Sequence, residues 1–214
     1  GKNLCRNFNA LGALSCVVDS TDSGQAMARK IAPEIPVGSS FEDALDNPSV
    51  RAVALATPAE THSGMAIRAM ESGKDVFVEK PMALTLDDAL RMKEVAVRAG
   101  RILMVGHLLE FHPAILQLRD LISNGTLGKV NYVYSNRLNF GKVRTEENAL
   151  WSFAPHDVAV ILRLMGKSPV EVSATGGSFI TKGLADTTVS NLLFADESRA
   201  HIFVSWLHPF KEQR

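Results

Sequence analysis

Short apolar runs that recur along the first half of the chain are the feature that most constrains its fold. They occupy residues 14–19, 50–56, 75–78 and 102–105, and the last three follow one another at intervals of about 25 residues. A strand that lacks polar alternation is typical of a parallel sheet, where both faces are buried. The segments between the runs have the spacing of amphipathic helices, so the pattern predicts repeated β-α-β units.

Helix boundary signals agree with this pattern. Thr85 and Asp88 have the spacing of a capping box, and Gly100 is expected to end the same helix in a left-handed conformation. Gly73 is expected to end a preceding helix over residues 60–72 in the same way. A further helix is predicted over residues 1–11.

The pattern changes after Lys129. Residues 130–135 and 170–175 alternate apolar with polar side chains, which is typical of strands that have one exposed face. Residues 192–195 and 200–207 predict a hairpin around the turn 196–198, and residues 153–165 predict a helix. The fold class is therefore α/β followed by α+β, with a parallel sheet in residues 1–110 and a mostly antiparallel sheet in residues 111–214.

Charge balance and cysteine content exclude several kinds of partner. The 23 Lys and Arg residues equal the 23 Asp and Glu residues, and no basic run creates a local positive field, so no nucleic acid is expected. No apolar stretch reaches the ~18 residues that a membrane span needs, so no membrane is expected either. Cys5 and Cys16 are the only cysteines and fit a reducing, cytoplasmic location.

Polar residues at the ends of the predicted strands are the first candidates for a binding site. Gly1 opens a helix and Asp19 ends the next strand, where dinucleotide-binding folds hold the adenosine ribose; Asp19 is otherwise a turn residue. Thr57 and Pro58 follow the run 50–56, where parallel sheets bind ligands, or they form only a stiff turn. His62 in the next helix is either a ligand contact or a packing or capping residue.

Glu79-Lys80-Pro81, at the end of the run 75–78, is the most specific motif in the chain. Pro81 keeps Lys80 away from helical backbone angles, so the lysine is expected at the edge of the sheet, where its ammonium group can reach a cleft. The alternative is a solvated surface lysine, which does not explain why these residues follow one another at a strand end.

Pro155 and His156 form a further candidate. Pro155 is expected in the first turn of the helix over residues 153–165, which places His156 near the positive helix end and favours its neutral, proton-accepting form. A buried, hydrogen-bonded histidine is the alternative. The other histidines have spacings that match no common ligand pattern, so no metal site is expected.

Taken together, these residues resemble the glucose-fructose oxidoreductase/inositol dehydrogenase/rhizopine catabolism (Gfo/Idh/MocA) family of oxidoreductases. The resemblance covers essentially the whole chain, and residues 146–157 are similar to members from nucleotide-sugar and cell-surface polysaccharide pathways. It implies an N-terminal NAD(P)-binding Rossmann domain in residues 1–110. It also implies a C-terminal antiparallel sheet in residues 111–214 that carries the substrate cleft and often an oligomer interface.

The resemblance assigns a role to individual residues. It implies hydride transfer between a sugar carbinol carbon, in particular that of a nucleotide-linked sugar, and NAD, in a homo-oligomeric complete protein. NADP is disfavoured because no cation follows Asp19. The catalytic residues are expected to be Lys80 and His156, the cofactor contacts Gly1, Asp19, Thr57, Pro58, His62, Glu79 and Lys80, and the substrate contacts His107, Arg137, Asn148 and Trp151.

Two alternatives stay open at this point, a dehydrogenase of a free polyol and a sensor on the same fold that holds a dinucleotide without turnover. Three positions depart from the common pattern of the family: Ser152, Glu110 and Ala59 stand where aspartate, arginine and asparagine are frequent. The loss of one anionic and one cationic group alters what a cleft can pair with, so no particular polyol follows from the resemblance.

The chain is also expected to be a fragment truncated at both ends. Gly1 resembles the third glycine of a dinucleotide fingerprint, so the first strand and the two glycines before it are predicted to be missing. That strand would lie between the runs 14–19 and 50–56. A gap between these two strands, or a sheet that has closed over it, is therefore predicted.

Overall fold

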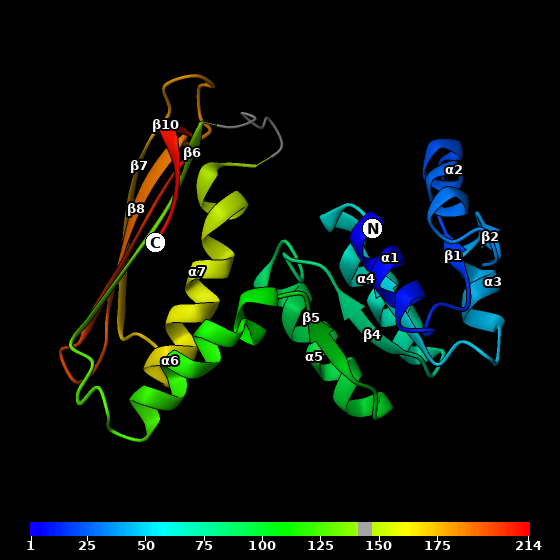
Figure 1. The fold of residues 1–214 in the computed structure, drawn as a ribbon, viewed down its shortest axis with the longest axis horizontal. Helices are drawn as coiled ribbons and strands as arrows, with labels where there is room; N and C mark the ends of the chain where they lie inside the picture. Colours follow the sequence, from blue (N-terminus) through cyan, green and yellow to red (C-terminus); the bar gives the residue numbers. More distant parts are fainter. Residues whose placement is uncertain (141–146) are drawn as a thin grey trace. The chain divides into compact units, whose positions relative to one another are not determined.

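The computed structural model describes residues 1–140 and 147–214, so residue 146 of the stretch 146–157 lies outside the described part. The chain forms two compact units, Gly1–Gly106 and His107–Arg214 (Figure 1). The first contains parallel strands alternating with helices, and the second a mostly antiparallel sheet. The predicted fold class is confirmed.

Every strand pair in the first unit is parallel. β3 and β4 pair with Ala52 opposite Asp75, and β4 and β5 pair with Val76 opposite Leu103. The predicted run 75–78 matches β4 at both ends. The elements are α1 (Lys2–Ala10), β1 (Val17–Val18), α2 (Asp22–Ile31), β2 (Val37–Gly38), α3 (Phe41–Asp46), β3 (Ala52–Leu55), α4 (Ala59–Glu71), β4 (Asp75–Val78), α5 (Leu86–Ala99) and β5 (Leu103–Val105).

The sheet of this unit is interrupted between β1 and β3. β1 pairs with β2, and β3 pairs with β4; within the described residues, no strand pairs with the other edge of β1 or of β3. The predicted gap between these strands is therefore present. β1 (Val17–Val18) is also shorter than the predicted run 14–19.

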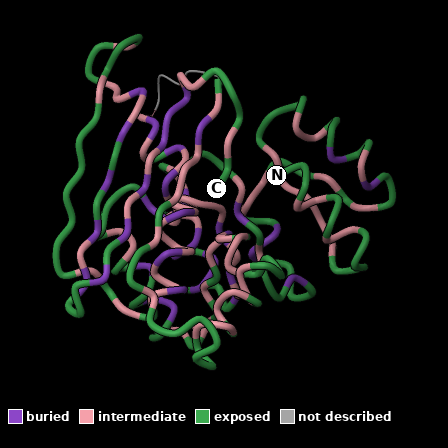
Figure 2. The backbone as a smooth tube through the Cα atoms, turned by 60° about the vertical axis from the view of Figure 1, so that its left-hand side comes forward, coloured by how far each residue is buried: buried purple, intermediate pink, exposed green. Residues whose placement is uncertain are grey.

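The core of the first unit lies between β3–β5 and helices α4 and α5. Met70 of α4 and Met92 of α5 are fully buried, as is Val78 of β4, and Figure 2 shows the buried segments in purple. Each such side chain contributes about 1.5–3 kcal/mol on burial. The polar residues that follow these strands are thus supported by a packed apolar layer.

Lys74, the residue directly before β4, is a buried cation. The residue is 7% exposed, and its Nζ donates hydrogen bonds to the carbonyl oxygens of Asn47 at 2.8 Å and Val50 at 2.7 Å. Asn47 is the C-cap of α3, so the ammonium group also lies at the negative end of a helix. Lys74 therefore joins the loop before β3 to the start of β4.

We expect Lys74→Met to lower the free energy of unfolding by about 2 kcal/mol or more, because the buried Val50 carbonyl oxygen and the part-buried Asn47 carbonyl oxygen lose their donor. Urea denaturation followed by circular dichroism measures this loss. Lys93→Met is the matched control: Lys93 is exposed on α5, and its replacement is expected to change stability by less than about 0.5 kcal/mol. Equal unfolding midpoints for the two variants would contradict the role given to Lys74.

The second unit is a five-stranded sheet with one face packed on α7. The strand order is β10-β6-β9-β8-β7, and all neighbours are antiparallel except β6 and β9. The predicted hairpin is confirmed, because β8 and β9 pair on either side of the turn 196–198. The elements are η1 (Leu108–Phe111), α6 (Pro113–Ser123), β6 (Tyr132–Phe140), α7 (Ala149–Met165), β7 (Glu171–Gly177), β8 (Thr187–Leu193), β9 (Arg199–Ser205) and β10 (Leu207–Gln213).

Helix α7 begins earlier than predicted. Asn148 is its N-cap and accepts a hydrogen bond from the Trp151 N–H at 3.0 Å, so Pro155 lies inside the helix and not in its first turn. His156 is consequently about two turns from the helix start at Ala149. The expectation that the positive helix end favours the neutral form of His156 is therefore wrong, since that field falls off within the first turn.

Asp186 is a buried carboxylate at the start of β8. It accepts hydrogen bonds from the backbone N–H groups of Phe179 and Ile180 and, at 2.8 Å, from Nε1–H of Trp206. Burial acts to raise the pKa of Asp186, but these three donors outweigh burial and hold its pKa below the usual value. The ionised carboxylate thereby anchors the loop between β7 and β8 to the buried Trp206.

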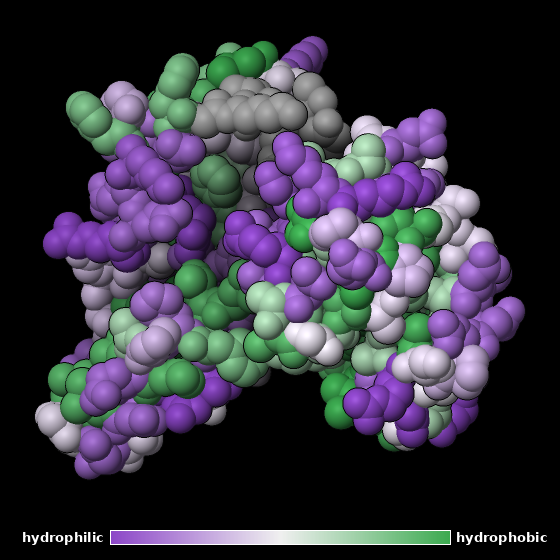
Figure 3. All heavy atoms as spheres, turned by 45° about the vertical axis from the view of Figure 1, so that its right-hand side comes forward, coloured by the Kyte–Doolittle hydropathy of each residue, from purple (hydrophilic) through white to green (hydrophobic). Residues whose placement is uncertain are grey.

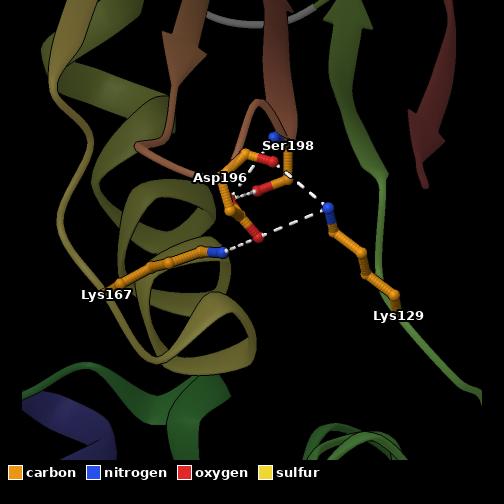
Figure 4. A network of polar contacts seen from close by, with 4 residues as sticks. All are labelled: Lys129, Lys167, Asp196 and Ser198. Carbon is orange, nitrogen blue, oxygen red and sulfur yellow. Dashed lines mark hydrogen bonds and ion pairs between the residues drawn. The ribbon is translucent and has the colours of Figure 1, made fainter.

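The turn between β8 and β9 is held by polar contacts around Asp196 (Figure 4). Lys167 Nζ lies 2.6 Å from Oδ2, and Ser198 Oγ donates to Oδ1 at 2.6 Å. Lys129 Nζ donates to the Asp196 carbonyl oxygen at 3.2 Å. Hydrogen bonds from Lys167 and Ser198 hold the pKa of Asp196 far below its usual value, so this carboxylate is ionised near neutral pH.

Candidate active site

Three segments of the first unit place polar residues at the carboxyl ends of its parallel strands. Asp19 follows β1, Thr57 lies just after β3, and Glu79 follows β4, while Gly106 follows β5. Ligands of open parallel sheets bind at this edge. The structure therefore brings the predicted cofactor residues to the part of the unit where such a ligand binds.

Asp19 is held in one orientation by the turn that follows it. Its Oδ1 accepts hydrogen bonds from the Thr21 hydroxyl at 2.7 Å and from the Thr21 N–H at 2.9 Å. The hydroxyl donor, followed by the backbone donor, lowers the pKa of Asp19. Thr21 also caps α2, since its Oγ1 accepts the Gly24 N–H at 3.0 Å.

Gly24 makes this position of the carboxylate possible and was not among the predicted site residues. A Cβ atom on Gly24 would lie 2.1 Å from Cγ of Asp19, so any side chain at this position would require the Asp19 carboxylate to move. The sequence signal was a glycine in the first turn of a helix, where alanine would be the better helix former. The space beside Gly24 therefore allows the Asp19 carboxylate to occupy its position.

Thr57 and Pro58 form the exposed turn between β3 and α4. Thr61 in the first turn of α4 donates from its hydroxyl toward the Thr57 hydroxyl at 2.7 Å and the Pro58 carbonyl oxygen at 2.7 Å. Gly1 lies beside the same strand end, because a Cβ on Gly1 would be 4.0 Å from Cβ of Ala56. Three of the predicted cofactor contacts, Gly1, Thr57 and Pro58, therefore gather here.

Glu79 and Lys80 are half-buried and follow β4 directly. The Glu79 N–H donates to the Leu55 carbonyl oxygen at 2.9 Å, and the Lys80–Pro81 peptide bond is cis. A Cβ on the buried Gly106 would lie 3.0 Å from Oε2 of Glu79, so this glycine leaves the space that the glutamate side chain uses. Gly106 is a second residue that the sequence interpretation missed.

His62 is placed differently from the exposed candidates. Its residue is 1% exposed, Nδ1 lies 2.8 Å from the Pro81 carbonyl oxygen, and Nε2 lies 3.0 Å from the Thr57 carbonyl oxygen. The imidazole thus has both nitrogens engaged with backbone inside the unit. His62 was expected to contact the cofactor directly. The structure instead places its ring against the backbone of Pro81 and of Thr57, which is itself an expected cofactor contact.

His107 and His156 meet in the second unit. Their ring centroids are 6.3 Å apart and the ring planes are nearly perpendicular, at 88°. His107 Nδ1 is buried and has no hydrogen-bond partner among the described residues. The predicted catalytic histidine and one predicted substrate contact are therefore neighbours.

Arg137 on β6 forms a two-pronged ion pair with Asp157 on α7. Nε lies 2.7 Å from Oδ2 and one terminal nitrogen lies 3.1 Å from Oδ1, while Ser135 Oγ donates to Oδ1 at 2.7 Å. Both ionic side chains are mostly buried, so their geometry is well defined. Arg137, a predicted substrate contact, is thus paired with Asp157, the residue that follows His156. The sequence interpretation did not identify Asp157 as its partner.

The other predicted substrate residues frame the start of α7. The Asn148 side chain is used as the helix cap, whereas Trp151 in the first turn is 47% exposed and available to a ligand. Glu110, at a departure from the family pattern, pairs with Arg163 of α7 at 3.3 Å. The negative charge at position 110 is therefore balanced within the unit.

Within residues 1–140 and 147–214, no three His, Cys, Asp or Glu side chains gather closely enough to hold a metal ion. In the same described residues, no helix combines the length and the apolar character of a membrane span.

Two family models match nearly the whole chain. Residues 1–107 match the oxidoreductase family with an NAD-binding Rossmann fold, and residues 115–214 match the Gfo/Idh/MocA C-terminal domain. The chain belongs to the Gfo/Idh/MocA oxidoreductase family. Its first unit is thus the NAD-binding part of this family, and its second unit is the family's C-terminal domain.

Relatives of this Gfo/Idh/MocA protein differ in their named reactions. A 2,7-anhydro-N-acetylneuraminate hydratase from Mediterraneibacter gnavus is 30% identical over 194 residues, 86% of this chain and 51% of that protein. A scyllo-inositol 2-dehydrogenase (NAD(+)) from Bacillus subtilis is 35% identical over 122 residues, 56% of this chain and 35% of that protein. The chain spans about half the length of the curated relatives that match it over most of its own length.

Solved structures extend the comparison. The UDP-N-acetylglucosamine 3-dehydrogenase GnnA from Acidithiobacillus ferrooxidans is 26% identical with a TM-score of 0.89, over 100% of this chain and 68% of that one. The scyllo-inositol dehydrogenase from Lactobacillus casei, with bound NAD(H) and scyllo-inositol, shares the fold at a TM-score of 0.79 and 19% identity, over 90% of this chain and 61% of that one.

The residues at the strand ends fit the nicotinamide dinucleotide that this family binds. Asp19 offers a fixed acceptor for ribose hydroxyl groups, and Gly24 leaves that carboxylate its space. Thr57 lies in the exposed turn before α4, and a helix N-terminus is a favourable place for an anionic or polar ligand.

Proposed function

We propose that the enzyme transfers a hydride between a carbinol carbon of a sugar, in particular a nucleotide-linked sugar, and NAD. The observation that carries the proposal is Glu79-Lys80-Pro81 at the carboxyl end of β4 in an NAD-binding domain. The likeness to a UDP-N-acetylglucosamine dehydrogenase over the whole chain supports a nucleotide-linked substrate. A free polyol such as an inositol is the alternative substrate class, supported by the scyllo-inositol dehydrogenase relative.

Lys80 and His156 divide the work in this proposal. NAD, when bound, accepts the hydride. His156 takes the hydroxyl proton, since a histidine side chain has an ordinary pKa of about 6.5 and needs little change to act near neutral pH. Lys80, from a residue type that ordinarily stays charged, orients and polarises the substrate oxygen, and Glu79 positions Lys80.

The remaining expected contacts are part of the same proposal. Gly1, Thr57 and Pro58 line the strand end where the cofactor binds, and Asp19 binds the adenosine ribose. His107 and Trp151 contact the sugar from the C-terminal domain. Asn148 and Arg137 support the substrate side by holding α7 in place. Asn148 caps the helix, and Arg137 pairs with its Asp157.

We expect the full-length enzyme to bind NAD at least ~10-fold more tightly than NADP, because the 2′-phosphate of NADP would be repelled by the Asp19 carboxylate. The lowered pKa of Asp19 keeps this charge in place at neutral pH. Fluorescence titration of the full-length enzyme with both cofactors measures the ratio. Asp19→Ser should narrow it, and Asp22→Ser, which removes an exposed acid from the same turn, should not. Tighter binding of NADP by the unaltered enzyme would overturn this assignment.

We also propose a homo-oligomer of the complete protein, formed through the second unit. Tyr132, Tyr134 and Val189 lie on the sheet face opposite the one that α7 covers, and they are 53%, 40% and 38% exposed. Figure 3, which views the molecule from another side, shows apolar (green) and polar (purple) side chains intermixed over the surface that faces the reader. The same face carries the polar side chains of Asn191 and His201, and exposed aromatic residues among polar ones are a common feature of subunit interfaces. The cytoplasmic location stays an expectation from the cysteine content.

The experiment that tests the proposed reaction is incubation of the full-length enzyme with NAD and a panel of nucleotide sugars and free polyols. Nicotinamide absorbance reports net oxidation, and mass spectrometry reports any product. The second readout is needed because one relative is named a hydratase, which implies a product without net NAD reduction. NAD binding with neither readout across the panel would favour a non-catalytic sensor.

A further inference from the structure

His62 joins the two turns that carry the candidate chemistry. It lies in α4, and its ring reaches the Pro81 carbonyl oxygen at 2.8 Å and the Thr57 carbonyl oxygen at 3.0 Å. Pro81 directly follows Lys80, and Thr57 lies two residues after Leu55, the last residue of β3. One buried side chain therefore bridges the ends of two neighbouring strands.

Both partners of the ring are acceptors. A carbonyl oxygen cannot donate, so each contact requires an N–H on the ring; the neutral imidazole has one N–H and the imidazolium has two. No other uncharged side chain presents nitrogens at two separated corners of a rigid plane. Loss of the ring would remove the one side chain that contacts both carbonyl oxygens, which favours movement of one or both turns.

Lys80 lies between two fixed points. On one side the Glu79 N–H donates to Leu55 at 2.9 Å, which holds the end of β4 against β3. On the other side the carbonyl oxygen of Pro81 is held by His62. Release of the second point would free the Lys80 backbone to move while the strand itself stays paired.

We propose that His62 is a positioning residue, which fixes the backbone of Lys80 through the Pro81 carbonyl oxygen and fixes the Thr57 turn relative to it. The ring is 1% exposed and acts through these two residues, with no contact to substrate of its own. This inference rests on the proposed function only in the step where Lys80 orients the reacting oxygen. The placement of Lys80 by His62 is a separate statement with its own measurement.

The first test is kinetic and uses the full-length enzyme. His62→Ala should lower kcat by about 100-fold, the loss that a displacement near 1 Å can cause, and should change KM for NAD much less. His62→Gln keeps one N–H donor and should recover part of kcat. Met92→Ala is the matched control, because Met92 is also fully buried in this unit but lies on α5; it should lower the melting temperature and leave kcat within about two-fold.

The second test reads the position of Lys80 without activity. Lysines carrying ¹³C-methyl groups give NMR signals, and the Lys80 signal is assigned by its absence in Lys80→Met. That signal should shift or broaden in His62→Ala, partly return in His62→Gln and stay unchanged in Met92→Ala. An unchanged Lys80 signal in His62→Ala would overturn the proposal, as would equal kcat values for His62→Ala and Met92→Ala. Unimpaired turnover of Lys80→Met would instead overturn the proposed catalytic role of Lys80, and the NMR result would still decide the role of His62.

Discussion

Lys80→Met is expected to lower kcat of the full-length enzyme by at least ~10³-fold, because methionine fills the space but cannot orient or polarise the substrate oxygen. Affinity for NAD should stay within a few-fold, since the proposed cofactor contacts Asp19 and the Thr57 turn follow other strands than Lys80 does. Single-turnover kinetics with saturating NAD, together with a cofactor titration, measure both quantities.

Two variants complete this experiment. His156→Ala is expected to give a comparable loss of kcat, and its pH profile should lose the limb that reports proton uptake by the base. Lys93→Met, on the exposed face of α5, should behave as the unaltered enzyme. Near-normal turnover by both Lys80→Met and His156→Ala would show that the assigned residues do not carry the reaction.

Residues 1–214 on their own are expected to bind NAD at least ~100-fold more weakly than a longer chain that supplies one strand between β1 and β3. The facing edges of β1 and β3 have no ladder partner among the described residues, so their backbone N–H and C=O groups lack the hydrogen bonds that a strand between them would supply. We also expect the shorter chain to be inactive and to aggregate more readily.

Calorimetric titration with NAD, light scattering and urea denaturation compare the two chains. The added strand should tighten NAD binding and raise the unfolding midpoint together, because the same segment closes the sheet and, by the family resemblance, supplies the glycine turn that approaches the pyrophosphate. Micromolar NAD binding by residues 1–214 alone would contradict the need for that strand.

The parts of the fold that could be predicted are those with a local cause. The apolar run 75–78 is β4 without change, and Thr85 caps α5 through the Asp88 N–H as its spacing predicts. Gly100 ends α5 at a positive φ of 61°. These features depend on a few neighbouring residues, so a single sequence contains the whole signal.

Other features depend on contacts between distant segments. The parallel pairing of β6 with β9 inside an otherwise antiparallel sheet joins strands more than 60 residues apart, and no local pattern encodes it. Gly24 and Gly106 were missed because what matters is the carboxylate opposite each of them. The start of α7 was misplaced because Pro155 was weighted as a helix start, although Asn148 provides the cap.

His62 shows the same limit inside the candidate site. Its distance from Thr57 along the chain is short, but its other partner, Pro81, is 19 residues away and is reached only after β4 has formed. The sequence identified a histidine in the right region, and the structure supplied its partners. Arg137 is similar. The sequence predicted a substrate contact for it, but no local pattern indicated its ion pair with Asp157 on α7.

Direct hydride transfer is best tested with a sugar that carries deuterium at the carbinol carbon. The full-length enzyme is incubated with this sugar and NAD, and the reduced nicotinamide is analysed by mass spectrometry. The proposed mechanism predicts that the deuterium appears on the nicotinamide ring, and that Lys80→Met suppresses its appearance. Reduced nicotinamide without deuterium, or a converted sugar whose deuterium never reaches the cofactor, would contradict it.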